Sequence, residues 1–272
     1  MTEAVTAAPS RTPAPAAVRL SGVSKAFGTG DAALLALDGV SLDVAPGEFV
    51  CLLGASGCGK STLLNLVADL DKPTSGSIDT GGARVALMFQ EPALFPWLTV
   101  SANIELALKM RGVPRAERRE RASALLASVH LSGFGKKRPH QLSGGMRQRV
   151  ALARALALTV DVPPGSDGGQ GTLLLMDEPF GALDAMTRDL LHDEIERIWR
   201  ERGLTVLFVT HNVREAVRLG DRVVLLSSRP GKVVEEFPVD IERPRRIDAA
   251  PVAALAGKIT DRLREEVGRH GG

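Results

Sequence analysis

Short runs of apolar residues recur along the chain, separated by longer stretches of helical or mixed composition. The clearest runs cover residues 49–53, 173–176, 205–209 and 223–226. Such runs are typical of strands buried on both faces, and the stretch 61–70 after the first run has the composition of a helix. Strands that alternate with helices predict an α/β fold with a parallel sheet covered on both sides.

Two segments depart from this alternation. Residues 18–50 contain alternating apolar and polar positions with turn residues at 28–30 and 46–47, which predicts an antiparallel β flank. Residues 101–135 are rich in Ala, Leu, Arg and Glu, which are good helix formers. They predict an inserted α-helical subdomain, which we place at about residues 95–145.

The two ends of the chain and one internal stretch lie outside these elements. Residues 1–17 are rich in Ala, Pro and Thr and lack the regions of a secretory signal, so we expect a disordered tail. Residues 159–171 have the composition of a loop. Within the extension 246–272, apolar residues recur at helical spacing after Pro251, which predicts an amphipathic helix packed on the body. The main domain is expected to span residues 18–245.

Composition and charge narrow the classes of function. The 272 residues include 34 basic and 32 acidic side chains, and this balance lacks the basic surplus of nucleic-acid-binding proteins. No uncharged apolar run reaches about 18 residues, so no segment is expected to span a membrane. Cys51 and Cys58 belong to no Cys/His cluster, which argues against a zinc site and is typical of reduced thiols in a cytosol.

The first apolar run ends at a glycine-rich segment that fits the pattern G-x-x-x-x-G-K-[ST]. Glycines let the backbone curl until its N–H groups converge on an anionic triphosphate, and the following helix adds the positive end of its dipole. Lys60 supplies a cation to the β- and γ-phosphates, and Ser61 offers a hydroxyl to Mg²⁺. The pattern predicts that ATP and Mg²⁺ bind at Gly54, Ala55, Ser56, Gly57, Cys58, Gly59, Lys60, Ser61 and Thr62.

Two adjacent carboxylates, Asp177 and Glu178, follow the apolar run 173–176. Parallel α/β sheets bind ligands at the carboxyl ends of their strands. Asp177 is therefore placed to hold the Mg²⁺ shell, and Glu178 to orient and polarise the attacking water. An Asp-Glu pair is more often solvated surface, but the buried strand before it and the phosphate loop upstream favour the catalytic interpretation.

His211 and Gln90 also follow apolar runs, at residues 205–209 and 85–89. At the end of a strand of the same sheet, either side chain can reach the γ-phosphate, the metal or the water. A structural role is equally compatible with the spacing, so the sequence pattern leaves both interpretations open.

Ser143, Gly144 and Gly145 precede a long helical run over residues 147–158. Serine and glycine at the start of a helix form either a second anion-binding end or an ordinary N-cap. Composition by itself favours the N-cap.

Taken in order, these motifs resemble the ATP-binding subunits of ABC transporters, and the resemblance covers about residues 18–245. It implies a P-loop NTPase core of the RecA type, with an antiparallel β flank and an inserted α-helical subdomain. The ordered motifs are the phosphate loop, Gln90, residues 142–145, residues 174–179, residues 182–184 and His211.

The resemblance implies a role for each residue that matches a family motif. Phe27 stacks on adenine, Gln90 couples the site to the membrane partner, and Asp184 lines a dimer interface. His211 is the switch histidine. The signature residues contact the γ-phosphate held by the other subunit, which implies a head-to-tail homodimer with two ATP molecules between the subunits; they are Ser143, Gly144 and Gly145.

A narrower resemblance is to the ATPases of nitrate, sulfonate and taurine importers, and it rests on residues 90–97, 176–184 and 209–216. It implies an ATP hydrolase at the cytoplasmic face of the cell membrane that drives solute uptake. A transmembrane permease is expected to dock near Gln90 and the segment 101–135. The solute itself is expected to meet the permease and an extracytoplasmic solute-binding protein.

The alternative is a soluble ABC ATPase without a transport role. Such proteins usually carry two cassettes or a long coiled coil and bind nucleic acids, features that this sequence lacks. Two positions depart from the family pattern: Met146 replaces the usual glutamine of the signature, and the segment 159–171 is longer than the usual link.

Overall fold

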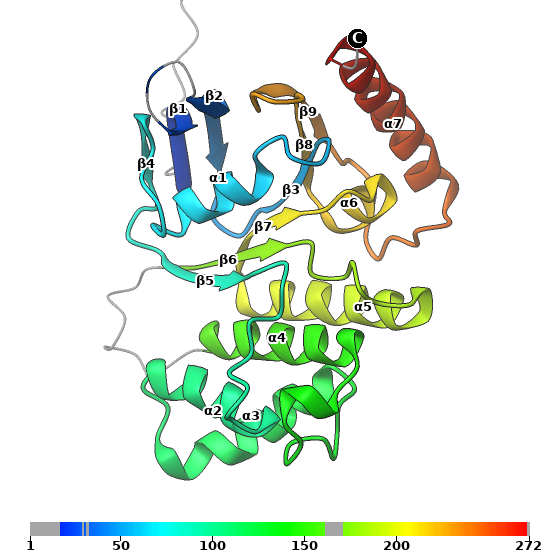
Figure 1. Ribbon diagram of the computed structural model, residues 1–272. Coiled ribbons are helices and arrows are strands. Elements are labelled where there is room, and N and C mark those ends of the chain that lie inside the picture. The colour runs from blue at the N-terminus through cyan, green and yellow to red at the C-terminus, as the bar shows by residue number, and fades with distance from the viewer. Residues whose placement is uncertain (1–16, 29, 31–32, 161–170, 271–272) are drawn as a thin grey trace, which may run out of the picture.

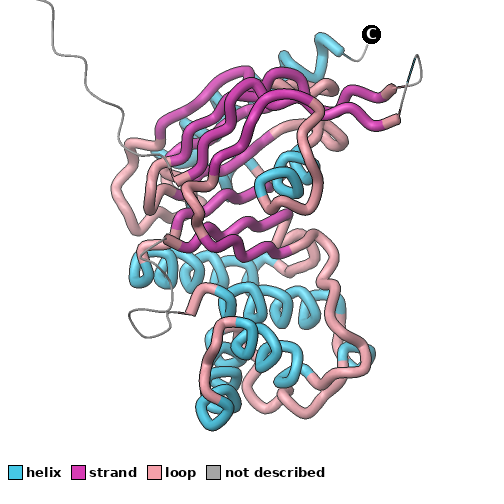
Figure 2. Tube along the Cα trace, turned by 90° about the vertical axis from the view of Figure 1, so that its left-hand side faces the viewer, coloured by secondary structure: helices cyan, strands magenta, loops and turns pink. Residues whose placement is uncertain are grey.

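The computed structural model describes residues 17–28, 30, 33–160 and 171–270. Two β-sheets occupy the upper part of the molecule, and most of the helices lie beneath them (Figures 1 and 2). The expected tail and the middle of the expected loop, residues 161–170, lie outside the described residues. No helix in the described part of the chain is long and apolar enough to cross a membrane.

The larger sheet has the strand order β5-β6-β7-β3-β8-β9. Its strands are β3 (Phe49–Leu53), β5 (Arg84–Met88), β6 (Thr172–Asp177), β7 (Thr205–Val209), β8 (Arg222–Leu226) and β9 (Val233–Pro238). All neighbouring strands from β5 to β8 pair in parallel, whereas β9 pairs antiparallel with β8. The predicted parallel sheet is confirmed, and its antiparallel edge is an addition that the apolar pattern does not predict.

The smaller sheet has the order β2-β1-β4, and both of its pairings are antiparallel. Its strands are β1 (Val18–Phe27), β2 (Leu34–Val44) and β4 (Ser75–Asp79). The first two strands lie within residues 18–50, as the predicted β flank requires. Most residues of β4 are exposed, so no apolar pattern indicates this strand.

Helices cover the larger sheet. They are α1 (Lys60–Val67), α2 (Val100–Met110), α3 (Arg115–Ser128), α4 (Gly144–Leu158), α5 (Ala185–Arg202), α6 (Val213–Leu219) and α7 (Ala250–His270), with a 3-10 turn at Pro139–Gln141. In Figure 1, α4 and α5 lie beneath the sheet, and α2 and α3 lie beneath α4. The predicted helical segment 101–135 contains α2 and α3, and the predicted C-terminal helix packs against α6 as α7.

Successive side chains of the central strands enter two different cores. In β3, Cys51 and Leu53 belong to the core shared with α4 and α5, and Val50 and Leu52 belong to the core shared with α1 and the β flank. Because both faces are buried, these strands are continuous apolar runs rather than alternating ones. This packing aligns the carboxyl ends of β3, β6 and β7 along one edge, where the polar side chains lie.

Candidate active site

The glycine-rich loop connects β3 to α1, and two of its glycines have no room for a side chain. A Cβ atom on Gly59 would lie 2.6 Å from the Leu37 side chain and 2.9 Å from the Ala36 carbonyl oxygen, and the residue has φ of +104°. A Cβ atom on Gly54 would lie 2.7 Å from Cys58 Sγ. The backbone therefore adopts this curl only with glycine at both positions.

Lys60 is the first residue of α1, and its side chain folds back over the loop. Its Nζ donates to the carbonyl oxygens of Gly54 and Ala55 at 2.8 and 2.9 Å and lies 3.8 Å from Cys58 Sγ. The side chain is buried, so its charge is directed into the loop rather than into solvent. This arrangement is suited to neutralise an anion held by the loop N–H groups.

A cavity of about 350 Å³ opens beside the phosphate loop. It is lined by Phe27, Leu34, Ala36, Ser56, Gly57, Gly59, Lys60, Ser61, Thr62, Gln90, Glu178 and Arg229. Phe27 and the apolar residues of β2 form one wall, and the strand-end residues Gln90 and Glu178 line another part. The cavity thus offers an apolar surface, an anion-binding loop and a carboxylate to a single ligand.

Asp177 is the last residue of β6 and is largely buried. Burial raises the pKa of its carboxyl group, because the charged form loses hydration, while a hydrogen bond from Ser61 and the charge of Lys60 oppose that shift. The adjacent carboxylate of Glu178 adds to the rise. A carboxylate and a hydroxyl that share a partly buried position supply the oxygen ligands that Mg²⁺ prefers.

Glu178 follows Asp177 in a strained turn. Its φ is +44°, in the left-handed region that residues with a side chain rarely occupy, and its backbone N–H donates to the Val209 carbonyl oxygen at 2.9 Å. Its Oε2 lies 3.0 Å from Nδ1 of His211. Strain of this kind persists where the surrounding structure holds it and is concentrated at functional sites. The structure thus brings Glu178 and His211, which follow two neighbouring strands, into contact.

Gln90 lies on the loop after β5, and side chains of α4 hold that loop. Gln148 of α4 donates to the Gln90 carbonyl oxygen at 3.3 Å. The guanidinium of Arg154, also on α4, donates to the carbonyl oxygens of Ala93 and Pro92 at 2.7 and 3.0 Å. Hydrogen bonds from two side chains of α4 therefore tie the loop that carries Gln90 to this helix.

The residues Ser143, Gly144 and Gly145 begin α4 and do not line the cavity of about 350 Å³ among the described residues. Ser143 caps the helix, because its Oγ accepts from the Met146 N–H at 3.2 Å. Within one chain, this segment is therefore the N-cap that composition favours. Nothing lies within 4 Å of a Cβ atom built on Gly144, so this face of the helix end is open.

Asp184 caps α5 in the same way. Its carboxylate accepts from the backbone N–H and the hydroxyl of Thr187 at 2.9 and 2.8 Å, and these hydrogen bonds hold its pKa below the ordinary value. Gly145 faces the residues just before this cap, and a Cβ atom on Gly145 would lie 3.2 Å from the Ala182 carbonyl oxygen. The starts of α4 and α5 thus lie side by side, outside the cavity.

Arg229 lines the cavity and was not among the residues predicted from sequence. It lies in the turn between β8 and β9, and its Nε donates to the Gly57 carbonyl oxygen at 3.1 Å. Two signals pointed to this turn: the preceding apolar strand ends at the same edge of the sheet, and the residues Ser-Arg-Pro-Gly are typical of a turn.

We expect Arg229→Ala to weaken ATP binding by about 3- to 10-fold, because the variant loses a hydrogen bond to the phosphate loop and a cation beside the ligand. Titration with a fluorescent ATP analogue measures the dissociation constant. Arg19→Ala, which removes an exposed arginine paired with Asp43 in the β flank, is the matched control and should bind normally. An unchanged affinity in Arg229→Ala would assign this residue no part in binding.

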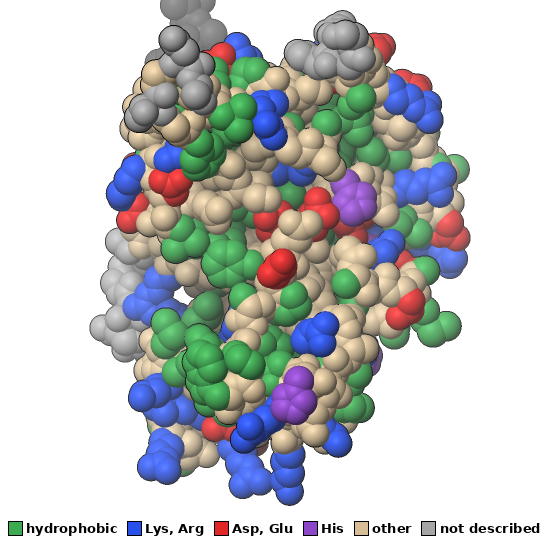
Figure 3. Space-filling view, in the orientation of Figure 1, with side chains coloured by type: hydrophobic (Ala, Val, Ile, Leu, Met, Phe, Trp, Pro, Cys, Tyr) green, Lys and Arg blue, Asp and Glu red, His purple; other side chains and the backbone are tan. Residues whose placement is uncertain are grey.

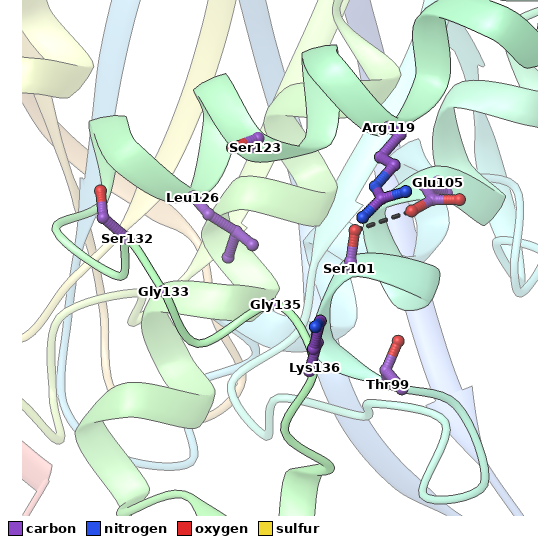
Figure 4. Close-up of a pocket in the computed structure, with 10 residues that line it drawn as sticks. All are labelled: Thr99, Ser101, Glu105, Arg119, Ser123, Leu126, Ser132, Gly133, Gly135 and Lys136. Atoms are coloured by element: carbon purple, nitrogen blue, oxygen red, sulfur yellow. Dashed lines mark hydrogen bonds between the residues drawn. The ribbon is translucent and has the colours of Figure 1, made fainter.

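A second, larger cavity of about 500 Å³ lies among α2, α3 and the loop after α3 (Figure 4). Its side chains are of mixed charge, with Arg119 and Lys136 opposite Glu105, and Ser101 Oγ donates to Glu105 Oε1 at 2.7 Å. None of the phosphate-loop, strand-end or signature residues lines it. This larger cavity is therefore not the candidate active site.

The parallel sheet, the phosphate loop and the strand-end carboxylates define a P-loop nucleotide hydrolase. A family model described as ABC transporter matches residues 37–181. The chain belongs to this family, as a member of its ATP-binding subunits, and is an ATP hydrolase.

Relatives and solved structures support this assignment. The chain is 49% identical over 239 residues to the taurine import ATP-binding protein TauB of Chromobacterium violaceum, a match that covers 85% of this chain and 87% of that protein. It is 45% identical over 253 residues to the aliphatic sulfonates import ATP-binding protein SsuB 1 of Mesorhizobium japonicum, covering 91% and 88%. A dimeric structure of the ATP-binding cassette MJ0796 bound to ADP and Pi is similar with a TM-score of 0.71 at 35% identity, covering 83% of this chain and 100% of that one.

Proposed function

We propose that this chain is the ATP-hydrolysing subunit of an ABC importer for a small solute of the nitrate, sulfonate or taurine type. It works as a homodimer at the cytoplasmic face of the membrane, beneath a permease that receives solute from an extracytoplasmic binding protein. The similarity to import ATP-binding proteins for taurine and aliphatic sulfonates supports the direction of transport. The observation that carries the proposal is a nucleotide cavity that contains the phosphate loop and Glu178 but not the signature residues.

The cavity suggests how ATP is held. Phe27, whose ring is half exposed at the cavity wall, stacks on adenine, and the loop residues from Gly54 to Thr62 surround the phosphates. Glu178 orients the attacking water, and His211, 3.0 Å from its carboxylate, contacts the γ-phosphate. Catalysis then consists of positioning and charge stabilisation, which is what phosphoryl transfer requires.

The side chains of Ser61, Asp177 and Gln90 fit a Mg²⁺ ion. Ser61 and Gln90 line the cavity and offer a hydroxyl and an amide oxygen, and Asp177 offers a carboxylate that shares a hydrogen bond with Ser61. When bound, the ion neutralises charge that develops on the phosphate oxygens. Asp177 and Ser61 hold their oxygens toward that position because β6 and α1 are packed on the same sheet.

The second half of the site comes from another copy of the chain. Ser143, Gly144 and Gly145 lie at the start of α4, which is open at Gly144. The first N–H groups of a helix have no partner within the helix, which suits the γ-phosphate of a nucleotide held by a partner. Asp184 lies next to them at the start of α5 and would line the same interface. In a head-to-tail dimer, each ATP is therefore enclosed by the phosphate loop of one subunit and the signature of the other.

An apolar groove beside the Gln90 loop is suited to the permease. The groove has a volume of about 280 Å³ and is lined by Leu87, Phe89, Ala93, Phe95, Asn103, Leu106, Ala107, Met110, Arg154 and Leu158. Apolar side chains gather on this face, over the loop after β5 and the helical layer (Figure 3). Met110 and Trp97 are 76% and 66% exposed, which is unusual for large apolar residues and marks a contact surface.

We expect Met110→Asp to uncouple transport while the isolated subunit hydrolyses ATP at its normal basal rate. A carboxylate in the groove would have to be desolvated against the permease, whereas the nucleotide cavity lies elsewhere. Solute uptake by cells and ATP turnover by the purified subunit are the two measurements. Met110→Leu keeps the apolar surface and should support uptake, and normal uptake by Met110→Asp would exclude this groove as the docking site.

Deletion of the gene tests the function as a whole. We expect the deletion strain to lose uptake of labelled taurine, an alkanesulfonate or nitrate, and the wild-type gene to restore it. A gene carrying Lys60→Ala should not restore uptake. Normal uptake of all three solutes by the deletion strain would refute this importer function while leaving the ATPase activity intact.

A further inference from the structure

A buried chain of hydrogen-bonded side chains joins α5, α6 and the end of β7, directly behind His211. His192 of α5 is fully buried, and its Nε2 lies 2.7 Å from Oε1 of Glu215 on α6. The other carboxylate oxygen of Glu215 accepts a hydrogen bond from the hydroxyl of Thr210. These three residues are at most 4% exposed, and none of them lines the nucleotide cavity.

The partners of His192 decide which of its two ring nitrogens carries the proton. Nδ1 lies 3.2 Å from a guanidinium nitrogen of Arg218, which can only donate, so Nδ1 accepts. The proton of the neutral ring is therefore on Nε2 and is donated to Glu215. Arg218 is itself held by Asp189 and Asp193 of α5 at 3.1 and 2.5 Å. The ring orientation and its hydrogen bond to Glu215 are thus set by α5.

Thr210 and Asn212 hold the backbone on both sides of His211. The hydroxyl of Thr210 donates to Glu215 and accepts from the Asn212 N–H at 3.0 Å. The side chain of Asn212 accepts from the Glu215 N–H at 3.2 Å and thereby caps α6. A single residue between two such fixed neighbours has little freedom, so the direction of the His211 ring toward Glu178 depends on Glu215.

His192 also contacts the turn that carries Glu178. Phe180, two residues later, packs edge-on against the His192 ring at a centroid distance of 5.0 Å. His192 therefore touches the supports of both members of the Glu178–His211 pair. His192 lies on α5, the helix that Asp184 caps, so the same helix joins this cap to the supports of the pair.

We propose that His192, Glu215 and Thr210 form a positioning relay that holds His211 in register with Glu178 and links that pair to α5. The relay residues are positioning residues, since none of them lines the nucleotide cavity. The inference rests on the catalytic role proposed for His211.

A double-mutant cycle between Thr210 and His211 tests the relay. Thr210→Val keeps the shape of the side chain but removes both hydrogen bonds of the hydroxyl. We expect kcat for ATP hydrolysis to fall at least tenfold, with KM for ATP within about twofold of wild type. In the His211→Ala background, Thr210→Val should cause no further loss, because the relay acts through that ring. A merely structural role would give multiplicative losses.

Thr205→Val is the matched control, at the other end of β7. Thr205 is also buried, and its hydroxyl oxygen accepts from the Gly47 N–H at 3.0 Å, but it has no contact with the relay. We expect its kcat to stay within twofold of wild type. Thermal unfolding identifies any variant that fails to fold.

Two variants of His192 keep the test open if Thr210→Val does not fold. His192→Gln retains an amide donor for Glu215 and should keep a larger share of kcat than His192→Phe, which retains only the ring packing. Wild-type kcat in Thr210→Val or in His192→Phe, or losses that multiply with His211→Ala, would overturn the proposal. Full kcat in His211→Ala would also overturn it and would leave nucleotide binding and the importer function unaffected.

Discussion

Glu178→Gln is expected to retain ATP binding and to lose ATP hydrolysis by about 100-fold or more. Glutamine has nearly the same shape as glutamate, so the strained turn at φ of +44° and the approach to His211 remain. The variant lacks the negative charge that polarises the attacking water. Because hydrolysis no longer opens the dimer, ATP should trap two copies together, and size-exclusion chromatography with ATP measures this directly.

Glu120→Gln on the exposed surface of α3 is the control for this variant. It removes one carboxylate of the same type far from the cavity and should change neither turnover nor assembly. Residual turnover near the wild-type rate in Glu178→Gln would show that another group activates the water. A monomer in the presence of ATP would contradict the proposed dimer, in which the signature residues of each subunit contact the ATP held by the other.

Lys60→Ala is expected to weaken ATP binding by about 10- to 100-fold, the range for the loss of a charge-assisted hydrogen bond. Lys60 is buried and is held by two loop carbonyl oxygens, so its removal leaves Gly54 and Ala55 without a donor as well as the phosphates without a cation. Equilibrium binding of a fluorescent ATP analogue measures the loss, and turnover should fall with it.

Lys72→Ala serves as the matched control, because Lys72 lies just beyond α1, pairs with Asp69 and is largely exposed. Its nucleotide affinity should equal that of wild type. Unchanged affinity in Lys60→Ala, with wild-type folding, would refute the phosphate-loop assignment and with it the whole description of the site.

Residues that are close in sequence account for most of what could be predicted. The strand runs, the phosphate loop, the Asp177–Glu178 pair and the helix caps are local patterns, set by burial of a sheet on both faces and by backbone conformations that glycine allows. The exposed strand β4 and the edge strand β9 escaped prediction, because a strand with few buried side chains leaves no apolar run.

The sequence by itself determined the kind of fold and the family, and it named the candidate residues of the site. Only the tertiary structure decided which of them share a cavity, that Arg229 joins the phosphate loop through Gly57, and that His192 supports His211 from a helix 19 positions earlier in the chain. The residues in these contacts are far apart in the sequence and do not recur at helix or strand spacing, so no local sequence pattern predicts them. The open position of Ser143, apart from the cavity, likewise depends on how α4 packs beneath the sheet and not on its own composition.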